Sequence, residues 1–310
     1  MKNARPSKKI SVPYLVGEYQ NIYMPKPDVY RGPDTEQFRQ GQWYDQWLTN
    51  DFTMVKGSDQ RWHAYGITHP KPKGYEDLFH YGEDVHEAEF QLFHCAFDCS
   101  LAKLAIEGGS EHCVEYDKVM YPAERPGRIE CWAPCMIRRE DLYYLFWSPE
   151  QIRYAVTKDM FHFSINDTVL FSGISYLRDP YIMEENGVYT MVYVTDHLCA
   201  RQSTDLLNWG DEWIMMKNPI GSISAQESPI LLRRGEWYYL FWCVYDGQNG
   251  AYDERTFVYA ACDLHSFEGK APIAMLKGHA IEVLSEDNQD YAVSVGYPGN
   301  GLHITKLCWN

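Results

Sequence analysis

The stretch RDPYIMEENGVY, residues 178–189, sets the pattern of this chain, because two other stretches repeat its spacing. Its final tyrosine lies nine positions after its proline, as Tyr143 lies nine positions after Pro134 and Tyr238 nine after Pro229. In each copy a polar turn divides two apolar runs, which is the pattern of a β-hairpin. Looser copies at Phe52 and Ile281, each with one extra residue before the next aromatic residue, bring the number of repeats to five.

A second motif follows the hairpin in the three middle copies and supports the repeat independently. It is an aspartate four residues before an aromatic residue, in the pairs Asp159 and Phe163, Asp205 and Trp209, and Asp263 and Phe267. The second to fifth copies recur every 46 to 52 residues, with three strands and room for a fourth. This period predicts an all-β fold, a five-bladed β-propeller, because each small sheet buries its faces against its neighbours. A solenoid would need polar capping repeats, which the chain lacks.

The repeats fill most of the chain and predict a single domain. We expect residues 50–310 to form the propeller and to contain the catalytic residues. Residues 1–49 are then an N-terminal arm, or they supply the strand that completes the last blade. The step from Phe52 to Pro134 is 82 residues, so we expect an insertion in or after the first blade, supplied by residues 70–125.

The composition of the chain excludes some classes of binding partner. With 28 Lys and Arg against 43 Asp and Glu, the net charge of −15 argues against nucleic acid and anionic membranes and suits a neutral substrate. The basic N-terminus precedes no apolar stretch, and no run approaches membrane-spanning length. Nine cysteines, an odd number, suit a reducing compartment. We therefore expect a cytoplasmic protein, although a secreted form whose leader had been removed would look the same.

Three repeats carry a carboxylate near their start: Asp51, Asp179 and Glu227. Because the first strand of each blade lines the central channel, we expect these three acids to meet at one mouth of it. Crowded acids repel one another, which raises the pKa of at least one. A protonated acid beside an ionised carboxylate is the requirement for cleaving a glycosidic bond. Each acid alone is more simply a turn or cap residue, but three at corresponding places favour a site.

The repeat heads carry a family resemblance. Asp51, Trp132-Ala133-Pro134, Arg178-Asp179-Pro180 and Glu227-Ser228-Pro229 resemble the five-bladed propeller glycoside hydrolases, and among them families 43 and 32, the arabinosidase/xylosidase and fructosidase groups. The resemblance covers about residues 45–310. It implies that Asp51 is the general base or nucleophile, that Asp179 orients and tunes the pair, and that Glu227 is the general acid. Phe52 and Ser228 stand where the fructosidase pattern has proline and cysteine, which weakens a fructoside assignment.

Residues around these acids are candidates for substrate binding. Arg178 is placed to hold a carboxylate or a sugar hydroxyl, and Trp132 to stack on a sugar face or to pack in the core. His86 and Glu87 lie in a charged segment that is either a substrate loop or a solvated edge. His279 faces the channel, as a core histidine or near a channel cation such as related propellers use. The full set of substrate-binding candidates is Asn50, Trp132, Arg178, His86, Glu87 and His279.

Metal ligands are not expected elsewhere. The pairs Cys95/Cys99 and Cys131/Cys135 lie in apolar, strand-like segments, where cysteine behaves as a small buried hydrophobe. We therefore expect no required cofactor and no metal ligand at the site, and a structural cation in the channel has no support from the sequence.

The function we expect is a glycoside hydrolase that cleaves terminal furanosides or pentosides from oligosaccharides. Two alternatives remain open. A glycoside phosphorylase or transglycosylase would need a cationic cluster at the pocket, where the repeat heads offer only Arg178. A non-catalytic propeller would bind carbohydrate or protein with the same fold.

Overall fold

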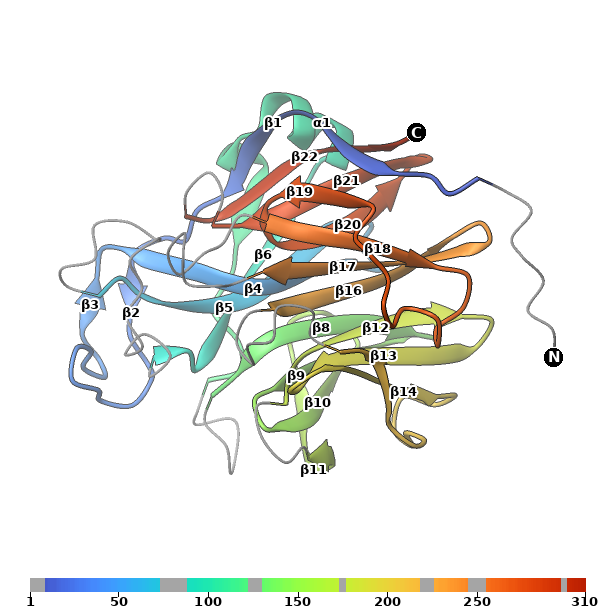
Figure 1. Ribbon diagram of the computed structural model, residues 1–310. Coiled ribbons are helices and arrows are strands. Elements are labelled where there is room, and N and C mark those ends of the chain that lie inside the picture. The colour runs from blue at the N-terminus through green and yellow to red at the C-terminus, as the bar shows by residue number, and fades with distance from the viewer. Residues whose placement is uncertain are drawn as a thin grey trace.

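The computed structural model describes residues 9–72, 88–121, 130–172, 177–217, 226–244, 255–296 and 300–310. Five four-stranded antiparallel sheets surround a central axis (Figure 1), so the predicted five-bladed β-propeller is confirmed. The sheets are numbered as blades 1 to 5 in chain order. Within each blade the first strand lies nearest the axis and contacts the first strand of the next blade, and β20 of blade 5 contacts β4 of blade 1.

Each blade takes its strands from one stretch of the chain, except that blade 5 also uses the N-terminal strand β1. The strands, from the axis outward, are as follows: blade 1, β4 (Trp47–Lys56), β5 (Trp62–Pro70), β6 (Gln91–Phe97) and β7 (Cys113–Glu115); blade 2, β8 (Trp132–Arg139), β9 (Leu142–Ser148), β10 (Gln151–Thr157) and β11 (Ser164–Ser172); blade 3, β12 (Arg178–Glu185), β13 (Val188–Val194), β14 (Leu198–Ser203) and β15 (Trp213–Met216); blade 4, β16 (Gln226–Arg234), β17 (Trp237–Val244), β18 (Arg255–Ala261) and β19 (Ala274–Lys277); blade 5, β20 (His279–Glu286), β21 (Gln289–Val295), β22 (Leu302–Trp309) and β1 (Pro13–Tyr23).

Strand β1 closes the ring. It pairs antiparallel with β22, from Pro13 opposite Trp309 to Tyr23 opposite Leu302, and Figure 1 shows the two strands side by side at the top of the molecule. The first 49 residues therefore include the outer strand of blade 5. Pairing the two ends of the chain in one sheet leaves no blade without four strands.

Tight hairpins join the first two strands of blades 2 to 5. Two residues separate the last paired positions, as between Glu185 and Val188 in blade 3. Those two residues, Asn186 and Gly187, have φ values of 52° and 79°, which suits the type I′ turn that matches the twist of the strands. In blade 1 the loop is longer, because Lys56 pairs with Trp62 and five residues lie between them.

The aspartate motif of the middle repeats forms the turn between the third and fourth strands. The Oδ1 atom of Asp205 accepts hydrogen bonds from the backbone N–H groups of Leu207 and Asn208, at 2.9 and 2.7 Å. Asp159 binds its turn in the same way. The aromatic residue that follows, such as Phe267 in blade 4, packs into the apolar core between neighbouring blades.

The predicted insertion lies within blade 1 and between blades 1 and 2. It includes the helix α1 (Leu101–Glu107) and the 3₁₀ turn Ser110–His112, both between β6 and β7. A small two-stranded sheet of β2 (Asp28–Val29) and β3 (Trp43–Tyr44) precedes blade 1. Within the described residues, no helix has both the length and the apolar character needed to span a membrane.

Candidate active site

A β-bulge near the start of every inner strand builds the site. In β12, Arg178 pairs with Val194 and Tyr181 pairs with Val192, so one extra residue is inserted between them. The same shift occurs in the other four inner strands. The residue after the paired one has a left-handed backbone in four blades, with φ between 43° and 58°: Ala133, Asp179, Ser228 and Ala280. Bulges of this kind re-aim side chains, and here they turn the strand starts toward the channel.

The bulges correct the expected alignment of the first repeat. Asn50 was aligned with Arg178, but pairing places Thr49 level with Arg178 and Glu227. The reason is the longer hairpin of blade 1, which holds all of the extra residues in its turn. Glu227, Asp179 and Asp51 consequently occupy three successive positions of the bulge. Their carboxyl groups meet at one place although the three residues lie at different positions along their strands.

Ser228 joins two of the three acids. Its hydroxyl donates a hydrogen bond to Asp51 Oδ1 at 2.5 Å. Its backbone N–H donates to Asp179 Oδ2 at 3.0 Å. The left-handed conformation of Ser228 places both donors on the channel side. Sequence reasoning treated this serine only as a departure from a family pattern, yet it lies level with Asp179 in the repeat, and that register is the signal that could have found it.

Arg178 joins Asp179 to the third acid. Its Nη1 atom forms ion pairs with Asp179 Oδ2 and, at 3.0 Å, with Glu227 Oε2. Its Nη2 atom donates to the backbone oxygen of Gln226 at 3.3 Å. The side chain is 13% exposed, so these buried charges depend on one another. Arg178 was predicted to hold a carboxylate or a sugar hydroxyl, and in the structure it contacts two carboxylates.

His279 lies on the other side of Glu227. Its Nε2 atom is 3.7 Å from Glu227 Oε1, and its Nδ1 atom is 3.4 Å from the Cys243 sulfur. Its backbone N–H donates to Ser294 Oγ at 3.0 Å. Burial works against a charged ring, yet Cys243, Glu227 and Asp51 raise the pKa of His279 to about 10. A cationic imidazole therefore fixes Glu227 from the side opposite Arg178.

The raised carboxylate pKa values fall on the two aspartates. Burial and repulsion from Glu227 raise the pKa of Asp51 to about 6. The charge of His279 and the hydrogen bond from Ser228 lower this pKa, but their effect is smaller. Burial raises the pKa of Asp179 to about 6 against the attraction of Arg178, and repulsion from Asp51 adds to it.

A small cavity continues inward from the acids along the channel. Its volume is about 30 Å³, and residues from all five inner strands line it, including Asp51 and Asp179. That volume holds one or two water molecules rather than a sugar ring.

Glu282 also lines this cavity, and the sequence analysis did not single it out. It is 7% exposed, and burial raises the pKa of its carboxyl to about 8. In the repeat it lies level with Phe52, Cys135, Tyr181 and Ile230. The other four blades have an apolar or aromatic residue at this position. Aligning the repeats by strand pairing could therefore have identified Glu282 from the sequence.

Other predicted residues are placed as follows. Asn50 donates from Nδ2 to Glu89 Oε1 at 3.1 Å, and Glu89 is buried. Trp132 packs against the apolar cluster between blades 1 and 2. His86 and Glu87 lie outside the described residues. A role in substrate binding remains a prediction for all four predicted residues, Asn50, Trp132, His86 and Glu87.

Comparisons with known proteins support the fold. No protein-family model matches the sequence, and no curated protein matches it. Among solved structures, a family 43 β-xylosidase/α-arabinofuranosidase from a compost microbial metagenome is similar, with a TM-score of 0.59 and 14% identity over 84% of this chain and 91% of that one. A family 43 enzyme from Xanthomonas citri has a TM-score of 0.59 and 12% identity over 84% and 87% of the two chains. An arabinanase from Bacillus subtilis has a TM-score of 0.55 and 13% identity over 84% and 94%. The chain shares the five-bladed propeller fold of these glycoside hydrolases.

Proposed function

We propose that this protein is a glycoside hydrolase that removes terminal pentosides or furanosides from oligosaccharides. The observation that carries the proposal is the meeting of Asp51, Asp179 and Glu227, from three blades, in one network through Ser228 and Arg178. Turn or cap residues would each bind their own local backbone. These acids instead bind groups that lie 49 and 177 residues away in the chain.

The contacts suit three different roles. Glu227 is 19% exposed and can be reached by a leaving oxygen, and on the family resemblance we assign it to protonate that oxygen. Asp51 activates water or attacks the anomeric carbon, because a carboxyl with a pKa of about 6 is ionised at neutral pH. Asp179 is buried and holds Arg178 and the Ser228 N–H, which suits a residue that orients the other two.

The substrate class rests on the family resemblance and on the similar structures. The compost metagenome enzyme was solved with xylotriose, which supports a pentose-containing oligosaccharide here. A fructoside remains an alternative through the resemblance to family 32. Its weight is small, since Ser228 makes contacts that a cysteine at that place would make less well.

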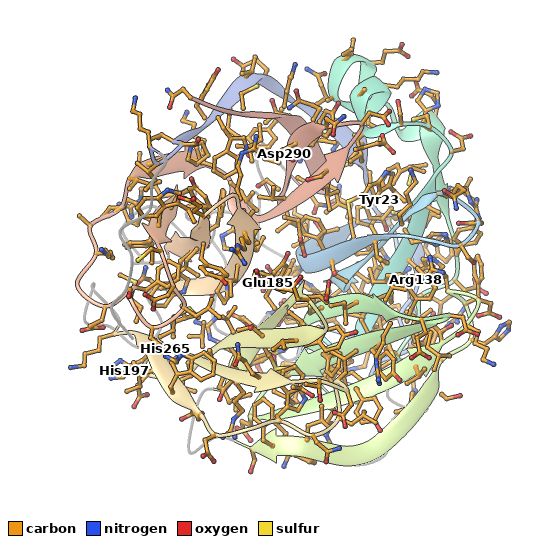
Figure 2. The ribbon with its side chains drawn as sticks, turned by 90° about the vertical axis from the view of Figure 1, so that its right-hand side faces the viewer. Tyr23, Arg138, Glu185, His197, His265 and Asp290 are labelled. Atoms are coloured by element: carbon orange, nitrogen blue, oxygen red, sulfur yellow. The ribbon has the colours of Figure 1, made fainter. Side chains whose placement is uncertain are left out.

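Hydrolysis is favoured over phosphorolysis by where the arginines lie. Among the described residues around the acids, Arg178 is the arginine present, and it is already paired with Asp179 and Glu227. The four arginines lie at the hairpin ends of β8 and β16, whereas the acids lie near the starts of the inner strands. Figure 2 labels Arg138, with Glu185 and Asp290 on other blades. The partners of the four arginines are Glu140 for Arg138, Asp205 for Arg139, Glu185 for Arg233 and Asp290 for Arg234.

A screen of aryl glycosides tests the proposal. It should include α-L-arabinofuranoside, β-D-xyloside, β-D-galactofuranoside and β-D-fructofuranoside, and proton NMR should follow the anomer released. We expect turnover of a pentoside or furanoside. Glu227→Ala should abolish cleavage of natural oligosaccharides while sparing aryl glycosides with good leaving groups, because those need no proton. Glu18→Ala, on the exposed face of β1, is the matched control and should behave as wild type.

Two outcomes would reject the proposal. Full activity of Glu227→Ala on natural oligosaccharides would remove the assigned acid. Binding of oligosaccharides without turnover by the wild-type protein, and with unchanged affinity in Glu227→Gln, would make it a carbohydrate-binding propeller. Product formation that depends on added phosphate would instead identify a phosphorylase.

A further inference from the structure

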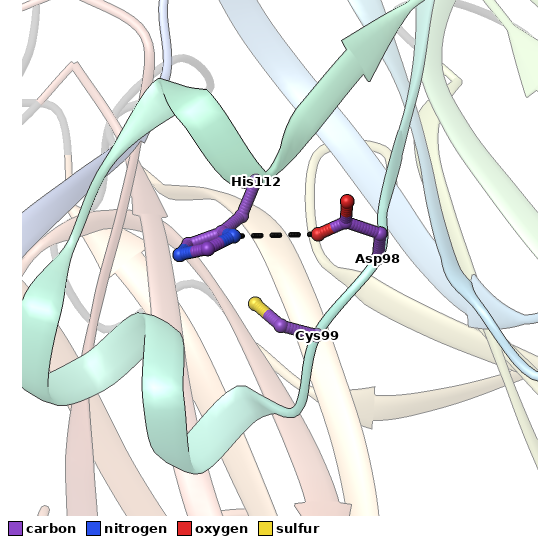
Figure 3. Close-up of side chains that lie close together, drawn as sticks. All are labelled: Asp98, Cys99 and His112. Atoms are coloured by element: carbon purple, nitrogen blue, oxygen red, sulfur yellow. Dashed lines mark ion pairs between the residues drawn. The ribbon is translucent and has the colours of Figure 1, made fainter.

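A second cluster of chemically active side chains lies outside the channel, in the segment between β6 and β7. Asp98, Cys99 and His112 converge there (Figure 3), and one ligand atom from each lies within 4.8 Å of the other two. Cys99 was expected to be a buried hydrophobe in a strand-like segment, but it follows β6 together with Asp98 and is partly exposed. His112 directly precedes β7. The helix α1 spans the distance between them, so residues thirteen apart in the chain meet at one place.

The donor set selects the kind of metal. A thiolate, an imidazole and a carboxylate are the three side-chain donors that zinc takes, whereas calcium and magnesium require oxygen ligands. Two ligands of a tetrahedral zinc ion lie about 3.3 to 3.8 Å apart, given bonds of about 2.0 to 2.3 Å. His112 Nδ1 lies 3.3 Å from Asp98 Oδ1, which matches that spacing.

The second ring nitrogen of His112 has a partner of the right kind. Its Nε2 atom lies 4.0 Å from Glu107 Oε2, on the side away from Asp98. In metal sites a ligating histidine directs its other N–H toward a carboxylate, which fixes the tautomer that coordinates. Glu107 Oε2, which also lies 3.8 Å from Lys103 Nζ, stands on the side where that carboxylate would be needed.

The backbone that carries the cluster is held in place. The Asp98 N–H donates to the His112 carbonyl oxygen at 3.1 Å. Ser100 caps the start of α1, and Glu286 of blade 5 accepts from the Leu101 N–H at 2.7 Å. Beyond the helix, the Gly109 N–H donates to the Asn21 carbonyl oxygen of β1 at 2.9 Å. A metal would therefore find its ligands already positioned, with little loss of conformational entropy on binding.

We propose that Asp98, Cys99 and His112 bind a zinc ion or a similar divalent transition metal, with water in the fourth position. The site lies where blade 1 meets the two outer strands that close the ring, since α1 contacts both β1 and β22. A metal here fixes both ends of the α1 segment and so reinforces ring closure. This role is structural and independent of the proposed hydrolase activity.

Cobalt(II) is the probe that tests the site. The full chain is stripped with a chelator and titrated with cobalt, and absorption is recorded in the visible and near ultraviolet. We expect a tetrahedral cobalt spectrum with a thiolate-to-metal band, saturating at about one cobalt per chain, which zinc then displaces. Zinc should also raise the melting temperature of the wild-type protein, because it binds the folded state.

Variants distinguish this site from adventitious binding. Cys99→Ser should lose the thiolate band, and His112→Gln should weaken zinc binding at least about tenfold. Cys308→Ser, a partly exposed cysteine on β22, should keep both. A wild-type protein without the band at saturating cobalt would overturn the proposal, as would a band that survives Cys99→Ser. Because His112→Gln leaves the thiol in place, unchanged zinc affinity in that variant would overturn it even if Cys99→Ser did not fold.

Discussion

This chain has two sets of aspartates, one in the outer turns and one at the channel. Their surroundings shift the carboxyl pKa in opposite directions. The outer-turn aspartates, Asp159, Asp205 and Asp263, bind backbone N–H groups of their own turns. Hydrogen bonds from Asn208 and Leu207 lower the pKa of Asp205. At the channel, burial raises the pKa of Asp51 and of Asp179 to about 6. The outer-turn aspartates occupy one position in three blades, whereas Asp51 and Asp179 occupy different positions of the bulge, so only strand pairing shows how the channel acids come together.

The difference lies in which partners each set has. An exposed carboxylate that accepts several N–H bonds is stabilised in its charged form, and its removal weakens a turn. The channel acids are crowded with one another and share Arg178 and Ser228. Crowding of this kind lowers stability in exchange for reactivity, which is the usual property of a catalytic site.

The largest effect is expected on turnover, from a substitution of Asp51. Asp51→Asn keeps an acceptor for the Ser228 hydroxyl but removes the base or nucleophile, so kcat/KM should fall about 10³-fold or more. Asp205→Asn is the matched control. It should leave kcat/KM near the wild-type value and lower the free energy of unfolding by about 1 kcal/mol, because its turn loses a charged acceptor. Steady-state kinetics and urea unfolding of both variants measure the two effects.

A reversed pattern would contradict this assignment. If Asp205→Asn reduced turnover as much as Asp51→Asn, the two sets would not differ in function. If Asp51→Asn kept full activity, the channel acids would be structural.

The sequence predicted the ring, the inner position of the strand starts and the three acids, because hairpin spacing and turn residues are local signals. It misaligned the first repeat by one residue, since only strand pairing reveals that the extra residues lie in the turn after Lys56. It missed Ser228 as a bridge because hydrogen bonds between residues 177 positions apart leave no local pattern. The channel acids were found by comparing repeats, and Glu282 was passed over because that comparison stopped at the bulge.

A second prediction concerns Glu282, a third kind of acid in this chain. It is buried, and burial raises its carboxyl pKa to about 8. The folded state keeps its proton up to about pH 8, whereas the unfolded state releases it near 4.5. The folded state thus binds more protons across this window, and stability falls as pH rises through it. Between pH 6 and 8.5 the loss from Glu282 should reach about 2.5 kcal/mol, at 1.36 kcal/mol for each pH unit below the pKa. Urea unfolding from pH 6 to 8.5 measures it.

Glu282→Gln should reduce that slope by the share that Glu282 contributes, because an amide does not titrate, while the share of His279 remains. Stability at pH 8.5 should then exceed that of the wild type. Asp51 and Asp179, with pKa values of about 6, and His279, with a pKa of about 10, also titrate in or across this range, so Glu282 is measured by the difference between the two slopes. Equal slopes in both proteins would show that the Glu282 carboxyl ionises normally in the folded state.

The smallest effect concerns the two serines that serve the two sets of acids. Ser228 donates its hydroxyl hydrogen to Asp51, and Ser203 donates its own to Asp205. The Ser228 bond lowers the pKa of Asp51, against burial and Glu227. Its loss in Ser228→Ala should therefore raise that pKa above 6 and move the acid limb of kcat/KM to higher pH, by about one unit. Ser203→Ala should leave that limb where it is, because Asp205 takes no part in turnover. A limb that moves equally in both variants, or in neither, would mean that Asp51 is not the group whose ionisation controls the reaction.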